Sequence, residues 1–216
     1  MSEALARQLE RFGIVPVIVI DNAESAVPLT KALVEGGLPC VEVTFRTAAA
    51  EDSIRRIAGS CPEVLVGAGT VIRVDQAERA INAGARFIVA PGFNPRVVDY
   101  CQSRAMAVFP GVCTPTEIEA AMERGLMNLK FFPAEPMGGL AYLKAISAPY
   151  SQVRFIPTGG VSLENVRSYL SFNRVLACAG TWLAPKEWIS AGDFDQVRRT
   201  VSEAVQIVSE VRAGKK

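Results

Sequence analysis

One lysine stands out because it lies inside an apolar segment. Lys130 is flanked by Leu129 and Phe131, and Pro133 ends the run. Burying an ammonium group costs free energy, and burial lowers the pKa of an amine, so a buried lysine becomes neutral more easily near pH 7. A neutral amine is the nucleophile that forms a Schiff base with a ketone. The alternative is that Lys130 lies at a strand end and extends its ammonium group to water.

Glu42 and Arg46 form a second group of residues that could take part in catalysis or substrate binding. Residues 40–46 alternate, which puts Glu42, Thr44 and Arg46 on one face of a strand and apolar residues on the other. The apolar face should meet helices, so the charged face should point into the interior. There Glu42 would act as a general acid/base, and Arg46 would bind a substrate carboxylate. The alternative is a structural ion pair of Glu42 with Lys130 or Arg46; the tendency of buried charges to mark sites favours catalysis.

Composition excludes several classes of protein. The chain has 216 residues, half of them hydrophobic, a net charge of +1 and no histidine. We expect one domain over residues 1–216 that binds neither nucleic acid nor membranes, because no basic surface or long apolar span is present. Without histidine, and with no cysteine spacing typical of a zinc site, we expect neither a metal nor a cofactor. Five unpaired cysteines and no signal-peptide core predict free thiols in the cytoplasm.

Eight short apolar segments, rich in β-branched residues, recur along the chain. Their starts lie about 20–26 residues apart, the length of a strand, a helix and two loops. They are residues 15–20, 41–45, 64–67, 87–90, 107–110, 128–131, 153–157 and 175–179. Eight such repeats predict a closed (β/α)8 TIM barrel with an N-terminal helix at residues 1–13. An open doubly wound sheet is the alternative, although no Gly-x-Gly-x-x-Gly motif follows the first segment.

Local signals mark the ends of several expected helices. Thr114 and Glu117 have the spacing of a capping box, and Asp193 should open the last helix. Glycines at the ends of helical segments should stop those helices before the next strand. These glycines are Gly37, Gly84 and Gly125.

The loops after the expected strands carry small and hydroxyl-bearing residues. Thr70 follows a Gly-Ala-Gly run that would admit a ligand or form a tight turn, and Pro91 could supply a wall of a pocket. The glycines at 159 and 160 precede Ser162, which should cap a helix, and such amides bind anions. Together with the loop at Gly180 and Thr181, they lie where barrels often bind phosphate.

These residues together resemble the class I 2-keto-3-deoxy-6-phosphogluconate (KDPG) aldolases, a family that also includes 4-hydroxy-2-oxoglutarate (KHG) aldolases. The motifs keep their order over nearly the whole chain. They are VPVI at 15–18, EVTFRT at 42–47, GAGTV at 67–71, KFFPAE at 130–135 and PTGG at 157–160. A departure is Thr181, where serine is expected in many members.

The resemblance implies a role for each candidate residue. Lys130 forms the Schiff base, and Glu42 transfers protons. The pyruvyl end of the substrate contacts Arg46, Thr70, Pro91 and Phe132, and the phosphate contacts Thr158, Gly159, Gly160, Gly180 and Thr181. The implied substrate is a phosphorylated 2-keto acid, and the implied assembly is a homotrimer. The preferred epimer at C4 stays open, although Thr158 resembles the gluconate-type enzymes.

Three rival functions remain at this point. A metal-dependent pyruvate aldolase usually needs histidine ligands, which the chain lacks. An isomerase or epimerase acting on phosphorylated sugars would leave Lys130 without a role. A non-catalytic assembly subunit would have no use for the set formed by Lys130, Glu42 and Arg46.

Overall fold

Short parallel strands form the centre of the computed structural model, which describes residues 2–214. Met1, where the first helix was expected to start, lies outside the described residues, as do residues 215 and 216. Each strand except the short β6 follows a helix, as the repeats predicted. Within the described residues the strands are β1 (Ile14–Ile18), β2 (Cys40–Thr44), β3 (Leu65–Gly69), β4 (Phe87–Val89), β5 (Ala107–Phe109), β6 (Gly111–Val112), β7 (Asn128–Phe131), β8 (Arg154–Pro157) and β9 (Cys178–Gly180).

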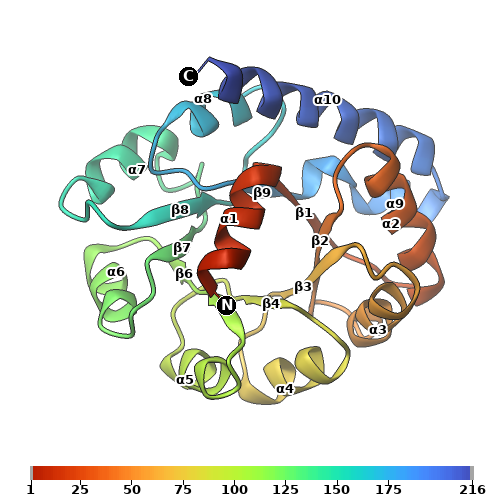
Figure 1. Ribbon diagram of the computed structural model, residues 1–216, viewed down its shortest axis with the longest axis horizontal. Helices are drawn as coiled ribbons and strands as arrows, with labels where there is room; N and C mark the ends of the chain where they lie inside the picture. The colour runs from red at the N-terminus through yellow and green to blue at the C-terminus, as the bar shows by residue number, and fades with distance from the viewer. Residues whose placement is uncertain (1, 215–216) are drawn as a thin grey trace.

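The helices surround these strands, apart from the first one, which crosses the centre of the view in Figure 1. They are α1 (Ser2–Phe12), α2 (Ala26–Glu35), α3 (Ala50–Ser60), α4 (Val74–Asn82), α5 (Pro95–Ser103), α6 (Pro115–Met122), α7 (Gly139–Ser147), α8 (Val166–Ser171), α9 (Lys186–Ala191) and α10 (Phe194–Ala213). An open doubly wound sheet would have helices on both faces, whereas here they form an outer ring. No helix among residues 2–214 is long and apolar enough to cross a membrane.

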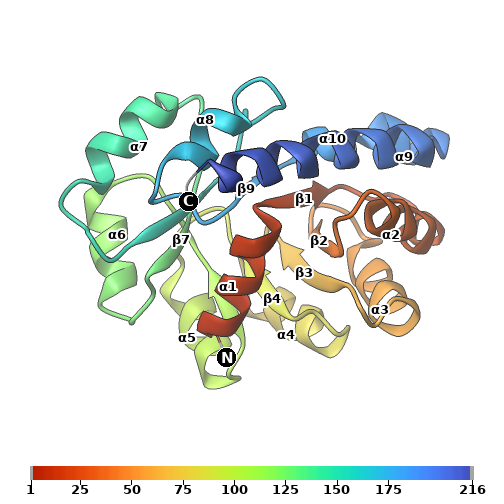
Figure 2. The same ribbon diagram turned by 45° about the horizontal axis from the view of Figure 1, so that its top comes forward.

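The prediction of eight strands in one closed barrel needs correction, because the fifth segment is divided. Pro110 has no backbone N–H and separates β5 from β6. β5 pairs with β4, whereas β6 pairs with β7. The strands therefore form two curled parallel sheets, in the orders β5-β4-β3-β2-β1-β9 and β6-β7-β8 (Figure 2). Isolated bridges from Phe155 to Val175 and from Thr158 to Ala179 connect the two sheets at their other edge.

Several of the predicted helix ends are confirmed at the positions that sequence signals marked. Thr114 and Glu117 form the capping box of α6, with the Glu117 carboxylate accepting from the Thr114 amide at 2.9 Å. Asp193 caps α10 by accepting from the backbone amide of Gln196 at 3.2 Å. Gly84 and Gly125, two and three residues after the ends of their helices, take positive φ values of 102° and 71°, where glycine is favoured. The five cysteines, all within the described residues, are free thiols.

Helix α1 closes the end of the interior at which the strands begin. Ala6 and Leu9 are buried in the core, and Gly13 joins the helix to β1 with a φ of 72°. Arg154, the first residue of β8, donates to the Glu10 carboxylate at 2.8 Å. Both views show α1 lying across the strands rather than in the outer ring (Figures 1 and 2). The interior is therefore closed at the end where the strands begin, and ligands must enter at the end where the strands finish.

Leu9→Ala should reveal how much this seal contributes to stability. Leu9 is 1% exposed, so its truncation should lower the free energy of unfolding by about 2–5 kcal/mol through lost burial and the cavity left behind. Leu5→Ala on the same helix is the matched control, because Leu5 is only partly buried. Chemical denaturation measures both variants. Equal losses would show that α1 is held by its general contacts and not by the insertion of Leu9.

Candidate active site

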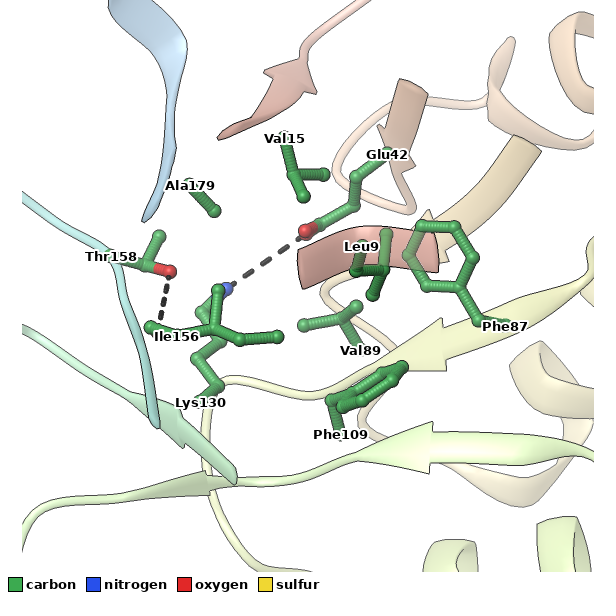
Figure 3. Close-up of a pocket in the computed structure, with 10 residues that line it drawn as sticks. All are labelled: Leu9, Val15, Glu42, Phe87, Val89, Phe109, Lys130, Ile156, Thr158 and Ala179. Carbon is green, nitrogen blue, oxygen red and sulfur yellow. Dashed lines mark hydrogen bonds and ion pairs between the residues drawn. The ribbon is translucent and has the colours of Figure 1, made fainter. Parts of the chain in front are cut away.

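Lys130 and Glu42 meet inside the fold, although they come from strands of different sheets. Lys130 lies on β7 and Glu42 on β2, and their side chains point toward each other in Figure 3. The Lys130 Nζ lies 3.8 Å from the Glu42 Oε1, and the two side chains are 7% and 2% exposed. The alternative in which Lys130 extends its ammonium group into bulk water is therefore wrong. The Nζ also lies 5.2 Å from the centre of the Phe132 ring.

The surroundings of this pair are almost entirely apolar. A cavity of about 10 Å³, the space of roughly one water molecule, lies between the pair and the side chains around it. Thr158 is the other polar residue in its wall. The apolar residues of the wall are Leu9, Val15, Phe87, Val89, Phe109, Ile156 and Ala179. Within the described residues, the Glu42 Oε1 accepts no hydrogen bond.

Burial controls the protonation of Glu42. Removal from water raises the pKa of the Glu42 carboxyl, and the nearby charges of Lys130 and Arg46 lower it by less. The net direction is upward, so Glu42 keeps its proton to a higher pH than an exposed glutamate. A carboxyl group with a raised pKa can still donate a proton at a pH where an exposed glutamate is already ionised, which suits general acid/base chemistry.

Two glycines on β3 create the space that the site needs. A Cβ atom on Gly69 would overlap the Glu42 Oε1, and a Cβ atom on Gly67 would overlap the Phe87 ring. The sequence interpretation assigned these glycines to ligand approach or a tight turn, and it missed their main contacts. The signal that could have found them is their spacing of two, which places both on the interior face of one strand.

A larger cavity of about 310 Å³ opens beyond Lys130, at the end where the strands finish. Every predicted site residue except Glu42 lines it, and Lys130 and Thr158 line both cavities. Sequence reasoning missed two apolar residues in its wall, Val17 and Val161. The predicted residues brought together here are Lys130, Arg46, Thr70, Pro91, Phe132, Thr158, Gly159, Gly160, Gly180 and Thr181.

Arg46 and Thr70 lie in the wall of this cavity close to the end of β2 and β3. Arg46 Nε donates to the Thr44 hydroxyl at 3.3 Å, and that hydroxyl donates to the carbonyl of Ile18 at 2.8 Å. The backbone of Thr70 has a φ of 55°, a left-handed conformation that a β-branched residue rarely adopts. Such strained positions concentrate at functional sites. The cavity therefore has a cationic side and a fixed hydroxyl-bearing residue next to it.

The glycine loop after β8 differs in one respect from the prediction. Ser162 does not cap a helix, because three residues of turn follow it and α8 begins only at Val166. Asn165 is the residue before α8, and its side chain makes no capping bond to the helix; its Oδ1 instead accepts from the Ser162 amide at 2.9 Å. Gly159 and Gly160 have positive φ values of 96° and 83°. Anion binding at this loop would therefore depend on the loop itself and not on a helix terminus.

The loop after β9 completes the same wall. Gly180 lies against the indole of Trp182, where a Cβ atom would overlap the ring. Thr181 is exposed and starts a short 3-10 turn. Sequence reasoning missed Trp182, whose Nε1 is buried and has no hydrogen-bond partner among the described residues. Over residues 2–214, no three histidine, cysteine, aspartate or glutamate side chains gather in a way that would hold a metal ion.

Comparisons with known proteins identify a family. The family model described as KDPG and KHG aldolase matches residues 5–200. The 2-dehydro-3-deoxy-phosphogluconate aldolase of Treponema pallidum (strain Nichols) is 50% identical over 200 residues, which is 93% of this chain and 95% of that protein. The KHG/KDPG aldolase of Escherichia coli (strain K12) is 45% identical over 193 residues, covering 89% and 91% of the two chains.

A solved structure is also closely similar. It is the KDPG aldolase of Legionella pneumophila, with pyruvate captured at low pH as a covalent carbinolamine intermediate. The TM-score is 0.88 at 35% identity, and the match covers 91% of this chain and 96% of that one. The motif resemblance, the family model and these relatives agree. This chain therefore belongs to the KDPG and KHG aldolase family.

Proposed function

We propose that the protein is a Schiff-base aldolase that cleaves KDPG to pyruvate and D-glyceraldehyde 3-phosphate. The same site would cleave KHG to pyruvate and glyoxylate, as the name of the Escherichia coli relative indicates. The observation that carries the proposal is the pair of Lys130 and Glu42, buried 3.8 Å apart between two cavities. A buried amine next to a carboxyl group with a raised pKa supplies both parts of imine chemistry, a nucleophile and a proton carrier.

The first step forms the imine. The lone pair of the Lys130 Nζ attacks the ketone carbon C2, the carbonyl electrons move to the oxygen, and a proton passes from the nitrogen to this oxygen to give a hydroxyl group. Protonated Glu42 then gives its proton to the resulting hydroxyl group, and water leaves. The small cavity next to both residues has room for one water molecule, which could relay this proton. The protonated imine that results carries a positive charge on nitrogen.

The second step breaks the C3–C4 bond. Glu42, now a carboxylate, takes the proton of the C4 hydroxyl group, and the aldehyde forms as the C3–C4 electrons move toward the imine nitrogen. The nitrogen acts as the electron sink, so the step needs no metal ion. Glu42 then returns a proton to C3 of the enamine. Water then attacks the regenerated protonated imine, Glu42 takes back a proton, and pyruvate leaves, which restores both Lys130 and the protonated Glu42.

The larger cavity holds the rest of the substrate in this proposal. Arg46 and Thr70 bind the pyruvyl carboxylate, and Pro91 and Phe132 form the walls beside it. The phosphate binds at the opposite loops, formed by Thr158, Gly159 and Gly160 after β8 and by Gly180 and Thr181 after β9. Their common position in one cavity with Lys130 supports the assignment.

We also infer the wider organisation of the enzyme. The strand order and the two isolated bridges that connect the sheets support a single (β/α)8 barrel domain over residues 1–216 that is interrupted at Pro110. The family supports a homotrimer, and the exposed side chains of Ile72 and Met137 are the large apolar groups that an interface would cover. The substrate supports a place in the cytoplasm and in the Entner–Doudoroff pathway of carbohydrate breakdown.

Reductive trapping tests the covalent role of Lys130. Treatment with pyruvate and borohydride should add one adduct, which intact mass would detect and peptide mapping would assign to Lys130. Lys130→Ala should remove it, while Lys144→Ala, a surface control on α7, should not. Trapping on another lysine would sink the proposal. A metal-dependent aldolase or a sugar-phosphate isomerase would give no adduct, and the first would lose activity in EDTA.

Glu42→Gln separates proton transfer from a structural ion pair. Turnover should fall by about 10²–10⁴-fold, because the titrating group is lost while its size is kept. Because burial raises the pKa of Glu42 in the folded state, the carboxyl stabilises the fold at low pH, and this contribution disappears as pH rises through that pKa. The variant should therefore be at least as stable as the wild type at pH 7.

The pH dependence of unfolding distinguishes a catalytic Glu42 from one whose main role is a structural ion pair. As the pH rises above the ordinary pKa of a glutamate, denaturation should show the wild type losing stability relative to Glu42→Gln. If the ion pair were the main role of Glu42, the variant would instead lose about 3–5 kcal/mol at pH 7, because the charge of Lys130 would remain buried without a partner. Near-normal turnover combined with that loss would contradict the catalytic assignment.

Thr181→Val tests the phosphate loops. A side chain at Gly160 would be strained by its φ of 83°, whereas Thr181 can lose its hydroxyl group without a change of shape. The KM for KDPG should rise by about tenfold, the effect of losing a hydrogen bond to a charged group. The KM for unphosphorylated KHG should change little. Steady-state kinetics on both substrates measures these two KM values. An equal rise in both would show that the phosphate binds elsewhere.

A further inference from the structure

A buried tyrosine and a glutamate join three segments behind the glycine loop. Tyr169, on α8, is 1% exposed, and its hydroxyl group donates to the Glu135 Oε1. Glu135 belongs to the same KFFPAE motif as Lys130, five residues further along the chain. The catalytic steps use neither residue, and neither lines the large cavity. Their contact therefore needs a different explanation.

The stem of Glu135 lies directly behind Gly160. A Cβ atom on Gly160 would lie 2.5 Å from the Glu135 Cβ and 2.6 Å from its Cγ. The backbone amide of Glu135 donates to the carbonyl of Gly159 at 2.9 Å. From the other side, Asn165 Nδ2 donates to the carbonyl of Gly160 at 3.0 Å. The two glycines are therefore held between Glu135 and Asn165.

The carboxylate of Glu135 is held at a defined position. A Cβ atom on Gly139, at the start of α7, would lie 3.0 Å from the Glu135 Oε1 and 3.4 Å from the Tyr169 hydroxyl oxygen. Burial first, and the bond to Glu135 second, raise the pKa of Tyr169, so its hydroxyl group remains a donor at neutral and alkaline pH. Without this donor, a negative charge on an exposed side chain would be free to move next to the loop that receives a phosphate dianion.

We propose that Tyr169 and Glu135 are a positioning pair that holds the Gly159–Gly160 loop in its phosphate-binding shape and keeps the Glu135 charge in place. The pair thereby determines the preference for phosphorylated over unphosphorylated 2-keto acids. This inference rests on the function proposed above and deepens it. Neither residue touches the reacting atoms, so the effect must be limited to the phosphate end of the substrate.

Tyr169→Phe tests the pair by removing only the hydroxyl group. The KM for KDPG should rise by about tenfold, the effect of losing a hydrogen bond to a charged group. The kcat, the KM for KHG and the borohydride trapping of pyruvate should stay near wild-type values. Tyr142→Phe is the matched control, because its hydroxyl group donates to a different loop, at the Cys113 carbonyl, over 2.8 Å. This control should leave the ratio of the two KM values unchanged.

Two variants of Glu135 keep the test independent of the folding of Tyr169→Phe. Glu135→Gln retains an acceptor for the tyrosine and should preserve the preference for KDPG, whereas Glu135→Ala should weaken it as Tyr169→Phe does. The double variant Tyr169→Phe/Glu135→Ala should be no worse than either single variant, because both remove the same interaction.

Two results would overturn the positioning role proposed for Tyr169 and Glu135. If charge near the phosphate were the main effect of Glu135, both glutamate variants would lower the KM for KDPG. If the contact were only structural, Tyr169→Phe would lower thermal stability and raise both KM values equally. Failure of the proposed function looks different, because the wild type itself would then neither cleave KDPG nor trap pyruvate.

Discussion

Two ionisable side chains share an interior that is otherwise apolar, and the rest of the structure accommodates them. Lys130 and Glu42 are both almost completely removed from water, and at 3.8 Å their attraction does not outweigh the desolvation of Glu42. Buried groups of this kind destabilise a fold unless they are neutralised or paired. The protein retains both of them, and around them it places branched aliphatic and aromatic side chains. Stability is thus given up locally where the chemistry needs a reactive amine and a mobile proton.

The strands divide the molecule into an apolar end and a polar end. At the start of the strands, α1 inserts Leu9 and excludes solvent. At their far ends, glycines and threonines leave backbone and hydroxyl groups around the larger cavity. Lys130 and Thr158 stand at the boundary and belong to both regions. Parallel strands make this division natural, because all of them end at the same face of the molecule.

Much of the site could be predicted from sequence, because chemically unusual residues stand out against a regular pattern. The alternation around Glu42 and the apolar setting of Lys130 identified the interior pair, and family motifs identified most of the cavity wall. The division at Pro110 and the late start of α8 were missed, because proline and serine have several permitted roles and tertiary contacts choose between them. The contact of Tyr169 with Glu135 joins residues 34 positions apart, and no local pattern indicates such a contact.

The glycines of β3 have a consequence for how this sequence can change over time. The interior volume that Gly67 and Gly69 leave unfilled is taken by Phe87 and by the carboxylate of Glu42. A larger residue at position 69 would therefore displace the Glu42 carboxylate, and one at position 67 would displace the Phe87 ring, so that substitutions at 69 and 42, and at 67 and 87, are coupled. The two positions of each pair are therefore expected to change together. A lineage that lost the acid at position 42 could fill position 69, and the acid could not then return by a single substitution.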